Sequence, residues 1–232
     1  MPLETKISPR AYWAPQTPLR SGLAIRAHKD LGSLGVALAI DGDTYFTASA
    51  HVIPPGGGIA PELYDGQAWI GAGALTCAPE TLAAWTDLER YDLCLLKAHT
   101  HATNDLHRAP EPFAETFVRP ELNARLRYLG ARNDTTQLCD HVGPYGSDDA
   151  LHFKQHAPLD PGALLLTRLP FDVIIEDVPG TSGAAVWTIE HGRLTSVGHL
   201  VAVSATHRGL VVEYQTAFAA LGLDRARVKG AA

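Results

Sequence analysis

Three short segments of the 232-residue sequence carry the residue types that nucleophilic catalysis requires. His51 ends the run T-A-S-A-H, Asp92 directly precedes an apolar run at 93–96, and Ser182 lies in the run P-G-T-S-G. A serine hydroxyl is a weak nucleophile unless a base removes its proton and a third group orients that base. The pattern therefore predicts Ser182 as the nucleophile, His51 as the general base and then acid, and Asp92 as the residue that orients His51.

A second acid competes with Asp92, because Asp87 is also followed by leucine. The apolar run that follows Asp92 indicates a buried strand. An acid at the start of such a strand would be desolvated and fixed, and its attraction to an imidazolium would be strong. We therefore expect Asp92, not Asp87, to be the partner of His51.

The glycines around Ser182 predict an oxyanion hole. Gly180 would let the chain turn so that its backbone N–H and that of Ser182 point to one place. Such donors stabilise the negative oxygen of a tetrahedral intermediate, and each contributes roughly 3–4 kcal/mol. Gly183 would leave room for the substrate backbone.

The elements that must position these residues are predicted to be many short strands. The sequence contains 21 glycines and 16 prolines that follow no regular repeat, a composition that favours turns. Asp41-Gly42 and His191-Gly192 predict hairpin turns, and 215–223 predicts a short helix. The pattern, which shows no alternation of strand and helix, favours an all-β barrel or sandwich. The predicted strands are 23–27, 34–40, 44–48, 68–70, 93–96, 125–129, 163–169, 173–175, 184–189, 194–203 and 210–214, while 82–85 is ambiguous between strand and helix.

The three motifs resemble those of the trypsin/chymotrypsin-like serine proteases, T-A-A-H, D-[aliphatic]-A and G-D-S-G-G-P, in the same His, Asp, Ser order. The resemblance spans about 23–214. It implies an all-β fold of two antiparallel β-barrels with a short C-terminal helix, and an active site in the cleft between the barrels.

The resemblance also implies a division of the chain. Residues 1–22 would form an N-terminal arm, and 23–106 a first barrel that carries His51 and Asp92. Residues 107–121 would be a connector, 122–214 a second barrel with Ser182 and the specificity pocket, and 215–232 a C-terminal helix and tail.

Three departures from the family's pattern are informative. Thr181 stands where secreted digestive relatives have the Asp that receives a new N-terminus, so that mode of activation is not expected. Ala184-Ala185 replace Gly-Pro. The cysteines that usually follow the His and flank the Ser are missing, and the chain looks most like intracellular bacterial or viral branches that lack disulfides.

The resemblance gives candidate substrate-binding residues in two places. Glu176, about six residues before Ser182, would select Lys or Arg at the pocket floor, unless it belongs to a polar turn after 173–175. The strand after the Ser supplies Val201 and Val203, and Val203 stands where many relatives have a Gly at the pocket mouth. Some relatives read Gln or Glu with a His in this strand, but His199 falls one place away, which turns its side chain to the other face.

Composition excludes several classes of protein. The net charge of −6 argues against nucleic acid as a partner. No window approaches the roughly 18 consecutive apolar residues of a membrane span. The three cysteines, Cys77, Cys94 and Cys139, are odd in number and far apart in the sequence, so they predict neither a disulfide framework nor a metal site. They favour a reducing compartment, and we expect a cytoplasmic protein.

No cofactor or metal is expected. The histidines at 99, 101 and 107 lie in a polar stretch without cysteines or carboxylates at ligand spacing, which is typical of a solvated loop.

The sequence therefore predicts a serine endopeptidase that acts on a protein or peptide through an acyl-enzyme. The alternative is a protease-like binding or structural module with residual or self-limited activity. An esterase is a weaker third hypothesis, because the G-x-S-x-G elbow is only partly present. A regulatory partner, and a blocking role for the N-terminal arm, stay open.

Overall fold

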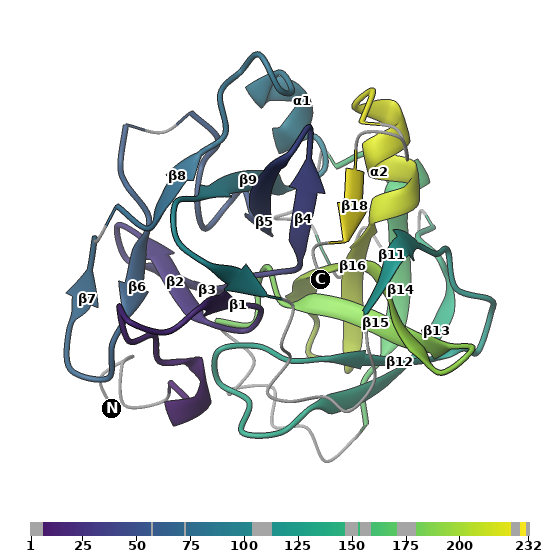
Figure 1. The fold of residues 1–232 in the computed structure, drawn as a ribbon. Coiled ribbons are helices and arrows are strands. Elements are labelled where there is room, and N and C mark those ends of the chain that lie inside the picture. The colour runs from purple at the N-terminus through teal and green to yellow at the C-terminus, as the bar shows by residue number, and fades with distance from the viewer. Residues whose placement is uncertain are drawn as a thin grey trace.

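Strands dominate the computed structural model, as the turn-rich sequence predicts (Figure 1). The structure describes residues 7–56, 58–71, 73–103, 113–146, 153, 159–170, 180–223 and 228–230. Glu176, His107 and the predicted strand at 173–175 lie outside the described residues.

The strands are β1 (Leu19–Arg20), β2 (Ala24–Ala27), β3 (Asp30–Ser33), β4 (Ala37–Ile40), β5 (Asp43–Ser49), β6 (Glu62–Tyr64), β7 (Trp69–Ile70), β8 (Leu75–Cys77), β9 (Leu93–Ala98), β10 (Ala102–Thr103), β11 (Phe113–Phe117), β12 (Arg125–Tyr128), β13 (Gln137–Pro144), β14 (Leu164–Arg168), β15 (Ala185–Glu190), β16 (Arg193–Val203), β17 (Arg208–Glu213) and β18 (Val228–Gly230). The α-helices are α1 (Trp85–Glu89) and α2 (Tyr214–Ala220), and single 3₁₀ turns cover Pro9–Ala11 and Pro161–Ala163.

The second half of the chain closes into a six-stranded barrel. Its strands follow one another as β16-β15-β12-β13-β14-β17, and β17 pairs back with β16. Alternate residues point inward, as the two-residue period of a strand requires. The inward side chains form a buried cluster that includes Leu126, Cys139, Leu165, Val197 and Val211.

The first half has two larger sheets around a core of its own, and a small parallel pair of β1 with β10. One sheet has the order β18-β4-β5-β9-β8 and the other β3-β2-β6-β7. Between them lie buried side chains such as Leu23, Phe46 and Leu96. A third cluster joins the halves, since it includes Leu38 and Leu95 from the first half and Val212 and Tyr214 from the second. The prediction of an all-β, double-barrel fold with a short C-terminal helix is confirmed.

The chain end has a feature that the sequence did not reveal. Glu213 caps α2 because its carboxylate accepts the backbone N–H groups of Gln215 and Thr216. After α2 the chain returns to the first half, where β18 pairs antiparallel with β4 (Figure 1). The segment expected to be a connector also contains a strand, β11, which runs parallel to β16.

Both predicted hairpin turns are present. Asp41 and Gly42 have φ values of 51° and 90°, and they join β4 to β5. His191 and Gly192 have φ values of 50° and 74°, and they join β15 to β16. Two consecutive residues with positive φ give the turn whose twist matches that of the flanking strands.

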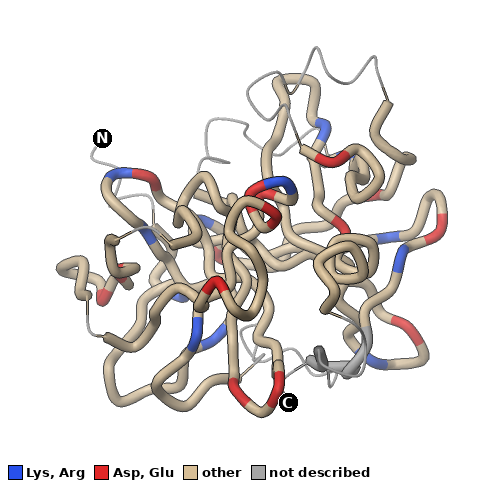
Figure 2. The backbone as a smooth tube through the Cα atoms, turned by 90° about the horizontal axis from the view of Figure 1, so that it is seen from above, with Lys and Arg blue, Asp and Glu red and all other residues tan. Residues whose placement is uncertain are grey.

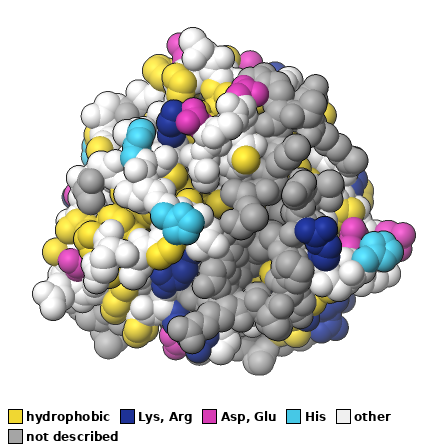
Figure 3. Space-filling model, viewed as in Figure 1, with side chains coloured by type: hydrophobic (Ala, Val, Ile, Leu, Met, Phe, Trp, Pro, Cys, Tyr) yellow, Lys and Arg dark blue, Asp and Glu magenta, His cyan; other side chains and the backbone are white. Residues whose placement is uncertain are grey.

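Charged residues are dispersed over the molecule. Acidic and basic positions are interspersed along the described chain in Figure 2. On the face seen in Figure 3, the visible charged and histidine side chains do not merge into one continuous patch. No helix among the described residues is both long enough and apolar enough to cross a membrane.

The pairing of β16 with β17 leaves no room beside Gly198. A Cβ added there would overlap the backbone carbonyl of Val212. We expect Gly198→Ala to lower the Tm by roughly 4–10 °C, since overpacking costs roughly 1–3 kcal/mol. Gly58→Ala is the matched control in thermal melts, because a Cβ there meets nothing within 4 Å. A Gly198→Ala protein as stable as the control would contradict this strand pairing.

Candidate active site

His51 and Asp92 form a two-point contact. The Nδ1 atom of His51 lies 2.8 Å from Oδ2 of Asp92, and the backbone N–H of His51 donates to Oδ1 at 2.9 Å. The Asp92 side chain is 6 % exposed, whereas that of His51 is 37 % exposed. The carboxylate is therefore a buried clamp on an imidazole that solvent can reach.

The Asp92 backbone has an unusual conformation that neighbouring groups hold. Its φ of 43° lies in the left-handed region, which costs a non-glycine residue about 1–3 kcal/mol. Its N–H donates to the carbonyl of Glu89 at 3.0 Å, and its own carbonyl accepts the N–H of Ala50 at 3.0 Å. This conformation places the acid between the end of α1 and the start of β9.

The state of the pair follows from its electrostatics. Burial by itself would raise the pKa of the Asp92 carboxyl, but the hydrogen bond and charge of His51 outweigh burial, and the pKa is lowered. An ionised carboxylate can only accept hydrogen bonds. Nδ1 of His51 therefore carries a proton, and in the neutral ring the lone pair is left on Nε2.

His199 lies behind Asp92. Its Nε2 atom is 3.0 Å from the Asp92 carbonyl oxygen, so Nε2 donates and Nδ1 is the bare nitrogen. The ring is fully buried and stacks on Tyr214 with centroids 5.6 Å apart. Burial lowers the pKa of His199 to about 4, so the ring is neutral near pH 7. In the sequence, His199 lies one residue away from the position where some relatives use a His to read Gln or Glu, and that offset turns a strand side chain to the other face. The buried ring, bonded to the Asp92 carbonyl, agrees with this offset.

The turn that contains Ser182 is bonded to β16. The N–H of Gly183 donates to the carbonyl of Leu200 at 2.8 Å, and the Ser182 hydroxyl donates to the carbonyl of Val201 at 3.1 Å. The β15–β16 and β16–β17 pairings both shift register along β16, the latter between Leu200 and Ala202. Such bulges re-aim side chains next to functional sites. One strand thus contacts Asp92 through His199 and Ser182 through Val201.

Ser33 joins the Ser182 turn to the first half. Its N–H donates to the Ser182 carbonyl at 2.8 Å, and its hydroxyl donates to the Gly180 carbonyl at 2.8 Å. The same hydroxyl accepts the N–H of Ala131 at 2.8 Å. The side chain of Ser33 is fully buried, so these bonds replace water completely. The sequence did not predict this role of Ser33, because its partners Gly180 and Ser182 are far away in the chain and no motif surrounds it.

Close backbone approaches explain the glycines on both sides of this contact. Gly183 has a φ of 87°, and a Cβ there would come within 2.5 Å of the Ser33 carbonyl oxygen and 3.1 Å of the Ser49 nitrogen. A Cβ on Gly32 would meet the Ser182 carbonyl oxygen at 2.9 Å and Cγ1 of Val52 at 2.8 Å. Ser182 therefore lies against the segment that carries His51.

The structure locates most of the other candidates. Gly180, at a φ of 98°, makes the turn before Ser182 that was expected of it. Val201 is 1 % exposed and its side chain packs in the cluster between the halves, so its contact with Ser182 is made by the backbone carbonyl. Val203 is half-buried beside the inner cluster of the second barrel. Asp87 is exposed on α1, whereas Asp92 contacts His51.

The expected solvated character of the histidine stretch fits its described part. His101 is exposed, and His99 forms a hydrogen bond with Thr76 at an exposed site. Among the described residues, no group of three or more His, Cys, Asp or Glu side chains could hold a metal ion.

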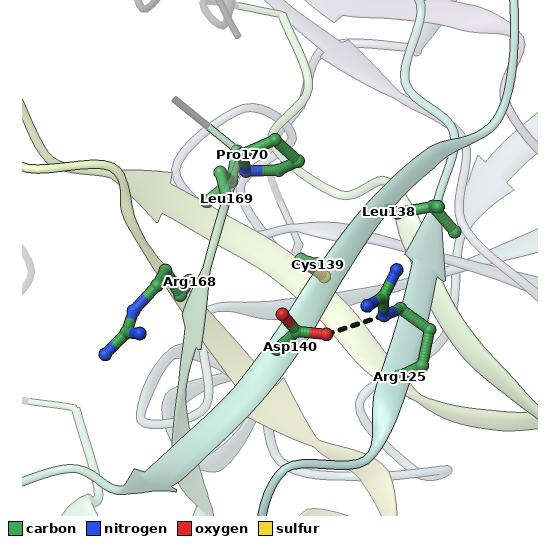
Figure 4. Close-up of a pocket in the computed structure, with 7 residues that line it drawn as sticks. All are labelled: Arg125, Leu138, Cys139, Asp140, Arg168, Leu169 and Pro170. Atoms are coloured by element: carbon green, nitrogen blue, oxygen red, sulfur yellow. Dashed lines mark ion pairs between the residues drawn. The ribbon is translucent and has the colours of Figure 1, made fainter. Parts of the chain in front are cut away.

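A separate pocket of about 260 Å³ lies on the outer face of the second barrel (Figure 4). Arg125 of β12 and Asp140 of β13 point toward each other there and form an ion pair of 2.6 Å. Arg168 of β14 lines the same pocket. The bonds of His51, Asp92 and Ser182 described above involve none of the residues that line this pocket.

Several solved structures that share this fold are proteases. Nocardiopsis protease (NAPase) aligns with a TM-score of 0.58 and 11 % identity, covering 93 % of this chain and 100 % of that one. Cellulomonas bogoriensis chymotrypsin gives 0.56 and 11 %, covering 93 % and 99 %. A glutamic acid specific serine protease, which uses a histidine triad in substrate binding, gives 0.56 and 12 %, covering 92 % and 100 %. The chain thus has the chymotrypsin-like protease fold.

Sequence-level comparisons add no relative to these structures. No protein-family profile matches the chain, and no curated protein matches it.

The buried His199 predicts a pH-dependent stability. The pKa of His199 is about 4 in the folded protein, whereas its ordinary value is 6.5. As the pH falls, the unfolded chain therefore takes up a proton at His199 before the folded protein does. Stability is then fully present above about pH 6.5 and falls by about 3 kcal/mol toward pH 4. His199→Gln keeps an N–H donor but does not titrate, so it should flatten this part of the curve.

Urea unfolding at a series of pH values measures the effect. The exposed His101→Gln variant is the control and should keep the wild-type slope. Equal slopes for wild type and His199→Gln would contradict the buried, neutral state of His199.

Proposed function

We propose that this protein is a serine endopeptidase with His51, Asp92 and Ser182 as its catalytic residues. The observation that carries the proposal is the two-point clamp of Asp92 on His51, at 2.8 Å to Nδ1 and 2.9 Å to the backbone N–H. A buried, ionised acid that fixes the ring in one tautomer is what a histidine base requires. The chymotrypsin-like fold supports the same assignment.

The proposed reaction begins at Ser182. Its Oγ attacks the carbonyl carbon of a peptide bond while Nε2 of His51 takes the hydroxyl proton. Asp92 stabilises the imidazolium that forms, and His51 then gives the proton to the leaving amine. In the second half of the reaction, water attacks the acyl carbon while His51 takes its proton. The ester bond to Ser182 then breaks, and His51 returns the proton to the Ser182 oxygen. Every step uses side chains of this protein, and no metal or cofactor takes part.

The Ser182 hydroxyl has to turn before it can react. In the structure it donates to the Val201 carbonyl at 3.1 Å, and a hydroxyl has one proton to donate. Rotation about the Cα–Cβ bond toward His51 breaks this bond and frees the Val201 carbonyl. We infer that this carbonyl then accepts an N–H from the substrate backbone, which is the substrate-binding role of Val201.

Gly180 and Ser182 would supply the oxyanion hole through their backbone N–H groups. The positive φ of Gly180 and the bond from Ser33 to its carbonyl support a fixed orientation of this turn. Donors that are fixed before the reaction need no reorganisation when the oxyanion forms. Val203 would line the substrate pocket from β16, and Glu176 stays a proposal for its floor. The substrate is a protein or peptide.

A second candidate is a protease-like binding module with residual or self-limited activity. The bond from the Ser182 hydroxyl to Val201 favours it, because a serine kept in that rotamer would not react. Repeated hydrolysis of a peptide substrate would favour the endopeptidase, and its absence would favour the binding module.

A fluorophosphonate probe and a peptide library test the proposal. We expect the probe to label wild type at Ser182 and not to label Ser182→Ala. Asp92→Asn should lower kcat/KM by roughly 10⁴, because the ring loses its fixed tautomer. The exposed Asp87→Asn is the matched control and should retain wild-type turnover. A folded wild type that is neither labelled nor active would overturn the endopeptidase and leave the binding module.

A further inference from the structure

Cys77 and Cys94 are distant in the sequence but adjacent in the fold. Cys77 is the last residue of β8 and lies opposite Leu96 of the antiparallel strand β9. Cys94 is two residues before Leu96, so it faces the same side of the sheet as the diagonal neighbour of Cys77. The Cys94 side chain belongs to the core cluster of the first half, and the half-buried Cys77 side chain packs against the same cluster.

The two thiols differ in exposure and acidity. Cys77 is half-buried, whereas Cys94 is 1 % exposed. The Cys94 thiol and the backbone N–H of Gly56 stabilise a Cys77 thiolate and lower the pKa of Cys77 to about 7. The contact with Cys77, followed by burial, raises the pKa of Cys94 well above its ordinary value. A thiolate therefore forms on the accessible sulfur, which is where an oxidant can reach.

We propose that Cys77 and Cys94 form a peroxide-sensitive thiol pair that closes to an intramolecular disulfide. The site is a modification site, and its reagent is a hydroperoxide such as hydrogen peroxide. This inference goes beyond the proposed function and does not depend on it.

The proposed oxidation has two steps. The Cys77 thiolate attacks one oxygen of hydrogen peroxide, the O–O bond breaks, and Cys77 sulfenic acid and hydroxide form. The Cys94 sulfur then attacks the Cys77 sulfur, the S–S bond forms, and the S–O bond breaks. The departing hydroxide takes the Cys94 proton as water. In total, two thiols are oxidised and one peroxide is reduced to two waters.

The first step prepares the second. The negative charge of Cys77 contributes to the raised pKa of Cys94. Conversion of the thiolate to a neutral sulfenic acid removes that charge. The resolving thiol therefore becomes easier to ionise only after Cys77 has been oxidised.

Strand geometry makes the disulfide easy to reduce. Diagonal α-carbons of paired strands lie roughly 7–8 Å apart, whereas disulfides span about 4.4–6.8 Å. One strand must therefore shift before the bond can close. We expect the shift at the end of β8, because Cys77 is the last residue of that strand. A strained disulfide has a high reduction potential, so a dithiol should reopen it.

The thiol pair touches both segments that carry the candidate active site. Cys94 follows Asp92 by two residues on β9. The Cys77 thiol donates to the carbonyl of Pro54 at 3.8 Å, in the loop that follows His51. Closing the disulfide withdraws the sulfur from this loop. We expect slower fluorophosphonate labelling of the oxidised protein, and this second readout rests on the proposed function.

The primary experiment detects the bond itself. Wild type is treated with hydrogen peroxide, alkylated without reduction, digested and mapped by mass spectrometry. We expect the peptides of Cys77 and Cys94 to be linked, Cys139 to be alkylated, and dithiothreitol to reverse the link. Cys139→Ser is the matched control and should form the same link, whereas Cys77→Ser should not.

Other products would overturn the proposal. Sulfinic acid at Cys77 with an alkylated Cys94, links between molecules, or a link that includes Cys139 would each contradict it. A specific link without any change in labelling rate would contradict the effect on the active site. A link in a protein that the probe never labels would reject the proposed function and leave the thiol pair intact.

Discussion

The approach of the Ser182 turn to strand β3 is the constraint on which the candidate site depends. Ser33 holds this turn at two points, the Gly180 and Ser182 carbonyls, each at 2.8 Å. Gly183 has no room for a side chain where it faces the backbone of the first half. The candidate nucleophile, Ser182 of the second half, is therefore fixed by the half that carries the candidate base, His51. A larger side chain at Gly183 would separate the halves at the point where the site needs them together.

Strand β16 completes this arrangement from the other side. It presents the His199 ring to the backbone of Asp92 and the Val201 carbonyl to the Ser182 hydroxyl. The left-handed conformation of Asp92 is unfavourable by itself, and the bond from His199 helps to hold it. A buried neutral imidazole can supply this bond without an uncompensated charge, at the cost of stability in acid. Asp92 and Ser182, the candidate acid and nucleophile, are thus both positioned by contacts with β16.

Local chemistry made part of this account predictable. The motifs of the three candidate residues and the Asp41-Gly42 turn depend on neighbours in sequence. The structure brings Asp92 to His51 and places Asp41-Gly42 in a hairpin turn, whereas the Ser182 hydroxyl donates to the Val201 carbonyl. The contacts of Ser33 with Gly180 and of His199 with Asp92 could not be predicted, because these partners lie 147 and 107 residues away in the sequence. The contact of Cys77 with Cys94 depends on the register of β8, a three-residue strand too short to predict from periodicity.

The most direct test is a crystal structure of the protein after reaction with a fluorophosphonate. The account predicts phosphorus bonded to Oγ of Ser182, a phosphonyl oxygen that accepts the N–H groups of Gly180 and Ser182, and a Val201 carbonyl released from the hydroxyl. His51 should still contact both oxygens of the Asp92 carboxylate. Phosphorus on another residue, or a phosphonyl oxygen turned away from both N–H groups, would contradict it.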